Sequence, residues 1–327
     1  MPFNGPNPED RFRGIPDPRV NRAYSAARPS SGAPSHARIV VKKKRNVWNV
    51  VFYIALAVFL ISAIALGALV FSYWQGQQLY RGVAETSGLA VGDITEHTEI
   101  DRIAIDWDRL RAINPDTVAW IYIPGTNVNY PVVQGKDNDF WLHHDFEGKN
   151  GWLAQFGTIF QEYRNAKNFT DDANFMFGHH LNDGSMFSAI DAMKDREKFD
   201  ASRTVYILTP QGNYLLRTFA LLHVDADDPL VQTTFESPQF FADYIQDKMN
   251  RSLFSLHDVA APGDMRKVFA FSTCDNLPQN GRYVLYAYVE KSTVAGVSVG
   301  DGDVREEAFD EAAAAASTAV DRQADAA

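Results

Sequence analysis

Cysteine is nearly absent from this sequence of 327 residues, in which Cys274 is the only one. A chain with one cysteine cannot form an internal disulfide bond. The thiol lies C-terminal to a segment that we expect to cross a membrane, on the side where cysteines normally pair. An unpaired thiol there indicates either a bridge to another molecule or a reactive nucleophile.

An excess of basic charge is lacking outside the N-terminal region. The formal net charge is -10, the first 46 residues carry an excess of Lys and Arg over Asp and Glu, and the last 27 residues are acidic. A net negative chain of this kind gives no support for nucleic-acid binding, and we predict no nucleic-acid partner. The sequence carries no calcium or cofactor motif either, and we predict no cofactor.

Charged residues are missing altogether between Val50 and Phe71. An apolar helix of about 20 residues crosses a hydrocarbon core of roughly 30 Å. The basic cluster Lys42–Arg45 adjoins its N-terminal end, and no basic residue follows on the other side until Arg81. The positive-inside rule therefore predicts a single-pass membrane protein with a cytoplasmic N-terminus and with the residues from about 75 outside. A cleaved signal peptide is the alternative, but the apolar run is long and no clear small-residue cleavage site follows it.

These features divide the chain into five expected segments. They are a disordered basic cytoplasmic tail (1–46), a transmembrane helix (47–74), a juxtamembrane helix or linker (75–104), a folded domain (105–292) and an acidic, disordered tail (293–327). Both tails lack the periodic apolar residues that a folded segment buries.

Short apolar runs separated by turn residues dominate the folded domain. The expected strands are 118–123, 128–133, 157–160, 174–177, 204–208, 214–219, 268–273 and 283–289. Helical periodicity occurs from 106 to 113 and from 237 to 253, and a proline stands at the first position of the second helix. Many short strands with few helices favour a mostly β fold, a closed or nearly closed β-barrel with flanking helices. A one-sided β-sandwich is the alternative.

Cys274 ends one of these apolar runs and needs an activating partner to react. A thiol with a pKa of about 8.5 is mostly protonated at pH 7, whereas the thiolate is the nucleophile. His179 and His180 follow another apolar run, where it opens into a glycine-containing loop. Arg282 begins the run after Cys274, so a hairpin of the two runs would bring both residues to the same end of the sheet. A histidine could then serve as base, and Arg282 could stabilise an oxyanion.

Structural interpretations of the same residues remain open at this point. A lone cysteine in a strand is often a small buried hydrophobe. Two His-His pairs, at 143–144 and 179–180, suggest a metal, but their spacing is unlike that of zinc ligands, and we predict no metal site. Ser185 lacks a Gly-x-Ser-x-Gly turn, which argues against a serine hydrolase. Residue spacing alone does not decide between a reactive and a structural Cys274.

Longer motifs around these residues resemble those of sortases, and among sortases those of class B. Phe271–Cys274 is similar to the Thr-Leu-x-Thr-Cys segment at the family's nucleophile, with Phe in place of Leu. Gly178-His179 followed by Asp183–Phe187 resembles a class B Gly-His segment that runs into Asp-Gly-Ser-Met-Phe. Asn114–Trp120 and Pro124–Gln134 resemble two further class B stretches, Asn-Pro-Asp-Thr-Val-x-Trp and Pro-Gly-Thr-Asn-x-x-Tyr-Pro-Val-Val-Gln.

The resemblance covers roughly residues 105–292 and implies a sortase β-barrel with flanking helices. It also implies a transpeptidase reaction, in which Cys274 attacks the Thr carbonyl of a C-terminal sorting signal. The resulting thioacyl enzyme then passes the acyl group to an amine. His179 is implied as the general acid and base, with His180 as the second choice. Arg282 is implied as the group that orients the substrate and stabilises the oxyanion.

The resemblance also extends to a substrate groove. The substrate-binding residues that it implies are Asn138, Leu142, Leu230, Val231, Ser272, Thr273 and Asp275. Ordinary packing at the rim of the barrel is the alternative for each of them.

Through the resemblance, the expected partners are secreted proteins with a C-terminal sorting signal and an acceptor amine from a peptidoglycan precursor. It implies a Gram-positive-type host, with the catalytic domain outside the cell membrane. Two alternatives stay open: a pilus-type sortase that joins pilin subunits through a lysine, and a non-catalytic, membrane-anchored binding protein on a sortase-like barrel. The second alternative predicts the loss of Cys274, His179 or Arg282, and all three are present.

Overall fold

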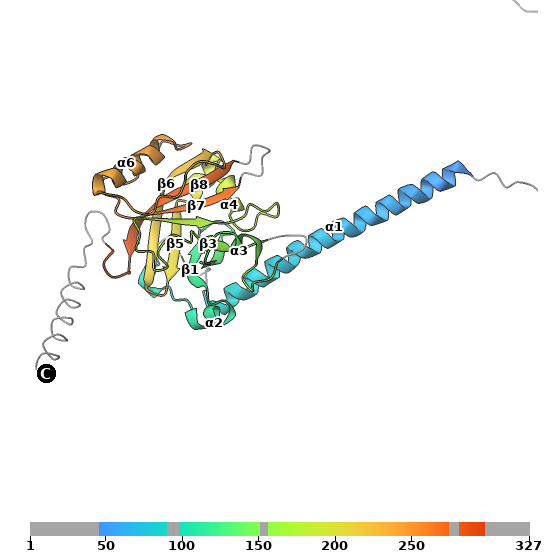
Figure 1. Cartoon of the computed structure of the whole chain (residues 1–327), viewed down its shortest axis with the longest axis horizontal. Helices are drawn as coiled ribbons and strands as arrows, with labels where there is room; N and C mark the ends of the chain where they lie inside the picture. The colour runs from blue at the N-terminus through green and yellow to red at the C-terminus, as the bar shows by residue number, and fades with distance from the viewer. Residues whose placement is uncertain (1–45, 90–93, 95–97, 151–155, 275–280, 298–327) are drawn as a thin grey trace, which may run out of the picture. The chain divides into compact units, whose positions relative to one another are not determined.

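The computed structural model describes residues 46–89, 94, 98–150, 156–274 and 281–297, and Figure 1 traces the chain. The chain falls into two compact units, residues 1–55 and 56–327. The first unit is described only for the beginning of helix α1 (Val47–Thr86). The second contains the rest of α1 and the β domain. The expected tails, 1–46 and 293–327, therefore lie mostly outside the described residues.

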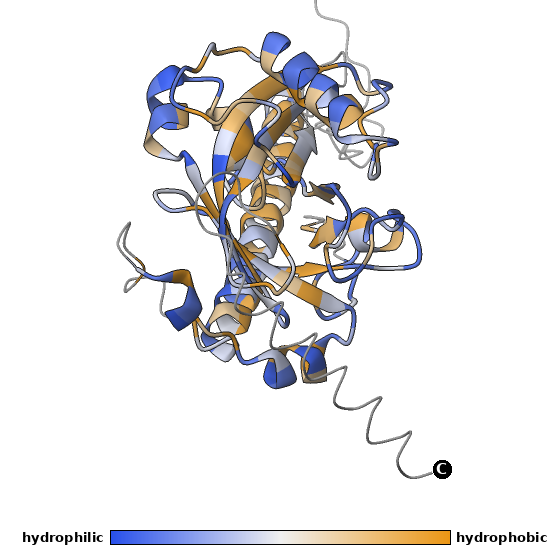
Figure 2. Ribbon diagram, turned by 90° about the vertical axis from the view of Figure 1, so that its left-hand side faces the viewer, coloured by the Kyte–Doolittle hydropathy of each residue, from blue (hydrophilic) through white to orange (hydrophobic). Residues whose placement is uncertain are grey.

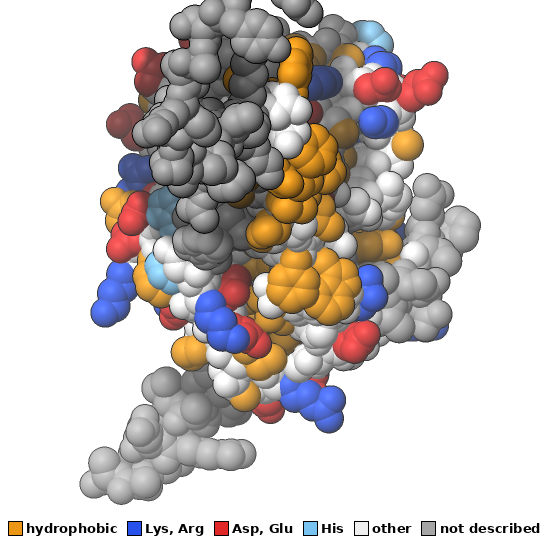
Figure 3. All heavy atoms as spheres, turned by 90° about the vertical axis from the view of Figure 1, so that its right-hand side faces the viewer, with side chains coloured by type: hydrophobic (Ala, Val, Ile, Leu, Met, Phe, Trp, Pro, Cys, Tyr) orange, Lys and Arg blue, Asp and Glu red, His pale blue; other side chains and the backbone are white. Residues whose placement is uncertain are grey.

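Helix α1 changes character along its length. It is long and apolar enough to cross a membrane, and it supplies most of the exposed large hydrophobic residues of the described chain. Exposed hydrophobic side chains gather on the face of the molecule that Figure 3 shows. Toward the C-terminal end, in contrast, Tyr80 and Val83 are buried in the core of the β domain. The same helix thus provides a membrane-compatible segment and a docked segment.

The remaining helices of the described chain are short and lie around the β-sheet. They are the 3₁₀ helix η2 (Ile100–Arg102), α2 (Trp107–Ile113), α3 (Phe140–His143), α4 (Ser188–Ala192), α5 (Arg196–Ala201) and α6 (Pro238–Asn250). Side chains cap several of them, because the first N–H groups of a helix have no partner within it. Asp106 accepts from Arg109 N at α2, and Ser237 accepts from Phe240 N at α6.

Eight strands close into a barrel. They are β1 (Thr117–Tyr122), β2 (Asn129–Val133), β3 (Ile159–Gln161), β4 (Ala173–Phe177), β5 (Thr204–Thr209), β6 (Gly212–Val224), β7 (Val268–Cys274) and β8 (Arg282–Ser292). Their order around the barrel is β1-β2-β3-β4-β7-β8-β6-β5. The prediction of a closed β-barrel with flanking helices is confirmed, and the alternative of a one-sided sandwich is wrong.

Two parallel pairings interrupt the otherwise antiparallel barrel. β2 runs parallel to β3, and β4 runs parallel to β7, with Phe177 opposite Ser272. β7 and β8 are antiparallel, with Cys274 opposite Arg282. The C-terminal ends of β4 and β7 and the N-terminal end of β8 therefore meet at one rim.

The hydrophobic core has two parts, on opposite faces of the sheet. Side chains alternate along β7, so that Phe269 and Phe271 join one cluster while Val268 and Ala270 join the other. Helix α6 covers the second cluster. Hydrophobic residues concentrate in the strands, whereas the peripheral helices and turns are mixed (Figure 2). Burial of each large apolar side chain contributes about 1.5–3 kcal/mol to the free energy of folding, compared with leaving it exposed to water. The packed barrel therefore gives its rim a rigid support.

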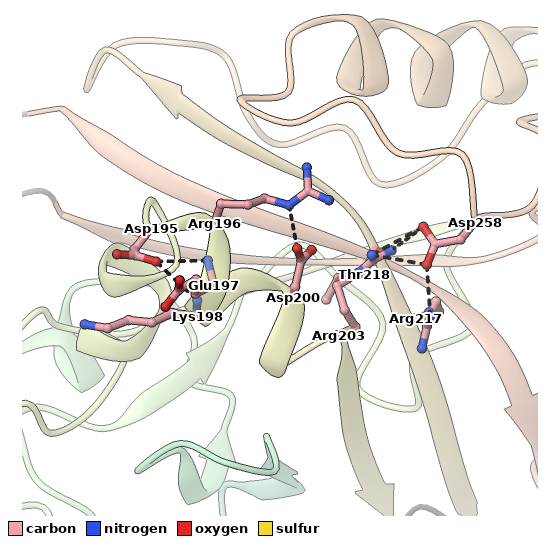
Figure 4. Close-up of polar contacts among 9 residues, drawn as sticks. All are labelled: Asp195, Arg196, Glu197, Lys198, Asp200, Arg203, Arg217, Thr218 and Asp258. Atoms are coloured by element: carbon pink, nitrogen blue, oxygen red, sulfur yellow. Dashed lines mark hydrogen bonds and ion pairs between the residues drawn. The ribbon is translucent and has the colours of Figure 1, made fainter.

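A cluster of charged residues ties the segment after α6 to strand β6 and to Arg203, the residue before β5 (Figure 4). Arg203 is 8% exposed and donates hydrogen bonds to Thr218 and to the carboxylate of Asp258. Arg217 also donates to Asp258, over 3.1 Å. Partial burial acts to raise the pKa of Asp258, but the charge of Arg203 and the hydrogen bond from Arg217 outweigh it and hold the pKa below its usual value.

Candidate active site

One rim of the barrel brings together the three residues that the sequence singled out. Cys274 is the last residue of β7, and its backbone pairs with that of Arg282 at the start of β8. On the other side of β7, Gly178 N donates to Ser272 O over 3.1 Å, and His179 follows directly. Adjacent strands thus carry His179, Cys274 and Arg282 to the same rim. The side chain of Cys274, and Asp275 as a whole, lie outside the described part of the structure.

The imidazole of His179 is largely buried and has a defined partner. Its Nε2 lies 2.6 Å from the carbonyl oxygen of Leu142, and its own carbonyl accepts from Phe187 N over 2.9 Å. Burial lowers the pKa of His179 below the usual value of 6.5, the Leu142 carbonyl opposes this, and the nearby His143 adds to it. The neutral imidazole is therefore favoured. Because a carbonyl can only accept, Nε2 carries the proton and Nδ1 is the nitrogen that can take up another.

Two glycines make room for this arrangement. Gly157 has a φ of +56°, and a Cβ on it would lie 2.8 Å from His179 Cδ2 and 2.6 Å from the Leu142 carbonyl oxygen. A Cβ on Gly178 would lie 2.4 Å from Ile159 Cδ1. Side chains at either position would displace the histidine or the strand before it.

Arg282 is partly exposed, and its place in the sheet is well defined. Its backbone pairs with Cys274 on one side and with Val224 of β6 on the other. A guanidinium group stays protonated at all physiological pH values and presents a planar fork of donors. The strand pairing therefore places a group of this kind on the residue opposite Cys274.

The predicted groove residues occupy different surroundings. Leu142 reaches His179 through its carbonyl, and Ser272 and Thr273 are 3% and 2% exposed within β7. Leu230 is buried in the cluster that α6 covers, and Val231 packs beside it. These residues keep their substrate-binding role as a prediction.

Asn138 lies apart from the histidine. Its side chain donates to Glu162 over 2.6 Å and accepts from Tyr163 N over 3.0 Å. Both partners follow β3, whereas His179 lies against Gly157, which precedes β3. The structure therefore does not bring Asn138 next to His179, and its predicted role in substrate binding stays a prediction.

Three further histidines, His180, His143 and His144, have local partners. His180 forms an isolated bridge with Met186. His143 lies 3.6 Å from Asp139, and His144 stacks on Phe140. Within the described residues, no three His, Cys, Asp or Glu side chains gather in a way that could hold a metal ion.

Two residues at this site have no recognised signal in the sequence: Gly157, which packs against His179, and Tyr80, which donates a hydrogen bond to Gly157. The sequence predicts that Gly157 begins a strand and that Tyr80 lies in a juxtamembrane helix or linker. The position of Gly157 directly before a short apolar run is the signal that the sequence offers for it. The place of Tyr80 at the site depends on the docking of α1, which the local sequence does not reveal.

Comparison with known proteins identifies the family. No family model matches the chain. It is 28% identical over 234 residues to sortase B of Listeria monocytogenes, covering 69% of this chain and 93% of that protein. The solved structure of Clostridium perfringens sortase B is 30% identical with a TM-score of 0.52, covering 55% of this chain and 97% of that one. A Staphylococcus aureus sortase B–substrate complex is 25% identical with a TM-score of 0.58, covering 68% of this chain and 99% of that one.

The two solved structures share the fold of the chain, and all three proteins share a quarter to a third of the aligned residues. The resemblance in the motifs around Cys274 and His179 thus extends over nearly the full length of solved relatives. The chain belongs to the class B sortases, a family of cysteine transpeptidases.

Proposed function

We propose that the chain cleaves a C-terminal sorting signal of secreted proteins at a Thr carbonyl and transfers the acyl group to a cell-wall peptide amine. The observation that carries this proposal is the convergence of β4, β7 and β8, which carry His179, Cys274 and Arg282 to one rim. Membership of the sortase family supports the reaction class.

The first half-reaction forms a thioacyl enzyme. The Cys274 sulfur attacks the carbonyl carbon of Thr in the sorting signal, and the thiol proton passes to Nδ1 of the neutral His179. The tetrahedral intermediate carries a negative oxygen, which the guanidinium of Arg282 stabilises. Collapse breaks the C–N bond, and His179 returns the proton to the leaving amine.

The second half-reaction resolves the thioacyl enzyme. An incoming amine attacks the thioester carbonyl, loses a proton to His179, and forms a new amide bond as the Cys274 thiolate leaves. The proton on His179 then returns to the sulfur, which regenerates the starting enzyme. Because the lowered pKa keeps His179 neutral, it can accept a proton in both half-reactions.

The substrate peptide is proposed to lie against the rim between β7, β8 and the segment after β6. The S. aureus relative has been solved as a complex with a substrate, which supports a peptide site in this family. Leu230 packs in the same cluster as Val284, two positions along β8 from Arg282. Leu230, Val231, Leu142, Ser272, Thr273 and Asp275 remain the proposed contacts, and Asn138 has the weakest structural support.

A membrane location completes the proposal. We infer that residues 47–74 cross the cell membrane once, with a cytoplasmic N-terminus and an extracytoplasmic catalytic domain over 105–292. Helix α1 supports the span by its length and apolar composition. An acceptor amine from a peptidoglycan precursor fits that location, and a pilin lysine is the competing acceptor.

A ligation assay tests the function directly. The full-length protein in detergent is incubated with a library of sorting-signal peptides and an amine nucleophile, and mass spectrometry searches for a thioacyl adduct on Cys274 and for ligated product. We expect both, and expect both to disappear in Cys274→Ala. Peptidoglycan-like and lysine-containing amines, supplied separately, distinguish the two acceptors.

Absence of an adduct with every peptide, together with a Cys274 that resists thiol-reactive probes, would refute the transpeptidase. That result would favour a structural cysteine in a membrane-anchored binding protein. Cleavage without ligation to any amine would leave the thioacyl step standing and overturn the proposed acceptor.

A further inference from the structure

The last turns of α1 contact the backbone that borders His179. Tyr80 is 5% exposed, and its hydroxyl donates a hydrogen bond to the carbonyl of Gly157. The same hydroxyl lies 3.3 Å from Thr158 Oγ1. Helix α1 therefore holds the chain at residues 157–158 through a buried polar contact.

That backbone forms one wall of the histidine site. A Cβ on Gly157 would meet His179 Cδ2 at 2.8 Å, so the ring packs directly against the glycine. Thr158 N donates to Trp141 O over 3.0 Å, one residue before the Leu142 carbonyl that binds Nε2. A shift of residues 157–158 would thus move both the wall of the imidazole and its hydrogen-bond acceptor.

Helix α1 also holds the loop that leads away from His179. Gln77 Nε2 donates to Asp183 Oδ2 over 3.0 Å. The ring of Tyr80 packs edge to face on Tyr130, with centroids 5.3 Å apart, and Tyr130 Oη accepts from Met186 N over 3.1 Å. The helix therefore contacts segments on both sides of the imidazole.

We propose that Tyr80, assisted by Gln77, is a positioning residue that fixes the imidazole of His179 for proton transfer. The proposal rests on the function proposed above, because it assigns a consequence to the placement of His179. Proton transfer requires a narrow range of distances, and a misplacement of about 1 Å can lower the rate by roughly 100-fold. Among the described residues, His143 of α3 is the titratable neighbour that acts on His179, while Arg282 lies at the same rim.

The test is Tyr80→Phe in the full-length protein in detergent, because this change removes only the hydroxyl and keeps the ring. We expect kcat to fall about 10-fold or more while KM changes by less than about 2-fold. The acidic limb of the pH–rate profile should move up toward pH 6.5, because a loosened imidazole regains water. Tyr122→Phe is the matched control, since Tyr122 is partly buried on β1 and stacks on Tyr206 away from the histidine.

A spectroscopic readout separates this inference from the proposed function. In protein whose histidines are isotopically labelled, an NMR titration without any substrate gives the pKa of His179. We expect that pKa to be higher in Tyr80→Phe than in the wild type and unchanged in Tyr122→Phe. If the wild type shows no transpeptidase activity but the pKa of His179 still differs between wild type and Tyr80→Phe, the proposed function is overturned. The positioning role of Tyr80 is then retained.

A purely structural role for Tyr80 has a different outcome. Tyr80→Phe would then melt at a lower temperature, yet keep the wild-type pKa of His179 and the wild-type pH–rate profile, and this overturns the proposal. Gln77 is exposed, so Gln77→Ala should fold even where Tyr80→Phe does not. If Tyr80→Phe does not fold, and the pKa of His179 in Gln77→Ala equals that of the wild type, the positioning proposal is also overturned.

Discussion

His179 shows how one side chain acquires a defined protonation state from its surroundings. Burial removes water from the imidazole, and the Leu142 carbonyl requires a proton on Nε2. Together they favour one neutral tautomer, with Nδ1 as the proton acceptor. A base that is already neutral at physiological pH does not have to lose a proton before it can act.

The activity should therefore persist below the usual pKa of histidine. The lowered pKa of His179 means that the neutral base survives as the pH falls past 6.5, and is lost only at a lower pH. We expect the acidic limb of kcat/KM to have its midpoint below pH 6.5, measured by peptide cleavage across a pH series. A midpoint above pH 6.5 would contradict the assignment of neutral His179 as the base.

Arg282 is expected to act through the shape of its guanidinium as well as its charge. Arg282→Lys keeps the positive charge but loses the planar fork of donors, so kcat/KM should fall by about 100-fold. The assay is ligation of a sorting-signal peptide to an amine. Arg109→Lys is the matched control, because Arg109 lies on the exposed face of α2, paired with Asp106. Turnover like that of the wild type in Arg282→Lys would remove Arg282 from the oxyanion site.

At the scale of elements, the segment after α6 depends on the charged cluster around Asp258. Arg203 is nearly buried, and removing its carboxylate partner would leave part of its guanidinium unpaired. The cluster joins α6 and the chain that follows it to the β5–β6 hairpin. It lies in the stretch that leads to β7 and so to Cys274.

Asp258→Asn should destabilise the fold by about 1 kcal/mol at neutral pH, measured by denaturant unfolding, since Asp258 is 54% exposed and solvent screens its charge. The pKa of Asp258 lies below 3.8 in the folded protein. Its stabilising contribution is therefore present above that value and is lost as the pH falls through the lower folded pKa. As the pH falls from neutral through the folded pKa of Asp258, the free energy of unfolding should decrease less in Asp258→Asn than in the wild type.

Asp200→Asn is the matched control for that change. Its partner Arg196 is 53% exposed, and such pairs contribute at most about 1 kcal/mol. An equal loss in the free energy of unfolding in Asp258→Asn and Asp200→Asn would show that the burial of Arg203 does not strengthen its ion pair with Asp258.

The strands could be predicted from the sequence because apolar runs between turn residues are a local signal. The run at 268–273 and the helix at 237–253 correspond closely to β7 and α6. The expected strand at 214–219 is longer in the structure, as β6 extends to Val224 and pairs with both β5 and β8. Pairing with two partners is a tertiary effect that a local pattern does not contain.

The site was predictable in part for the same reason. Cys274, His179 and Arg282 stand at the ends of apolar runs, which is visible locally. The hydrogen bond from Tyr80 to Gly157 joins residues 77 positions apart in the chain. The contact of His179 with Gly157 joins residues 22 positions apart. Such contacts follow from the order of strands around the barrel and from the docking of α1, neither of which has a local signature.

At the scale of the whole molecule, the barrel closes before the C-terminal tail begins. β8 ends at Ser292, and Thr293 N still donates to Asn213 O over 2.9 Å. Val294 and Val297 pack against the core. The described residues beyond 292 therefore contact the domain, while the proposed boundary at 292 stays a prediction.

Deleting residues 301–327 should leave peptide cleavage within about 2-fold of the full-length protein, because all strands and the rim residues precede the deletion. The measurement is kcat/KM for a sorting-signal peptide together with the thermal midpoint. Deleting 293–327 is the informative comparison, since it also removes Val294 and Val297 from the core. An inactive 301–327 deletion would show that this tail belongs to the working fold.

The parallel pairing of β4 with β7 has a consequence for the time at which the proposed active site forms. It joins Ala173 to Val268, 95 positions later in the chain. Contacts between such distant residues form slowly, because a long loop must be closed first, and β-rich domains fold in roughly milliseconds to seconds. During synthesis from the N-terminus, His179 is present in the nascent chain long before β7 is made and can dock beside it. Cys274 and His179, the proposed nucleophile and base, are adjacent only once β7 has paired with β4, so the proposed activity would report a completed barrel.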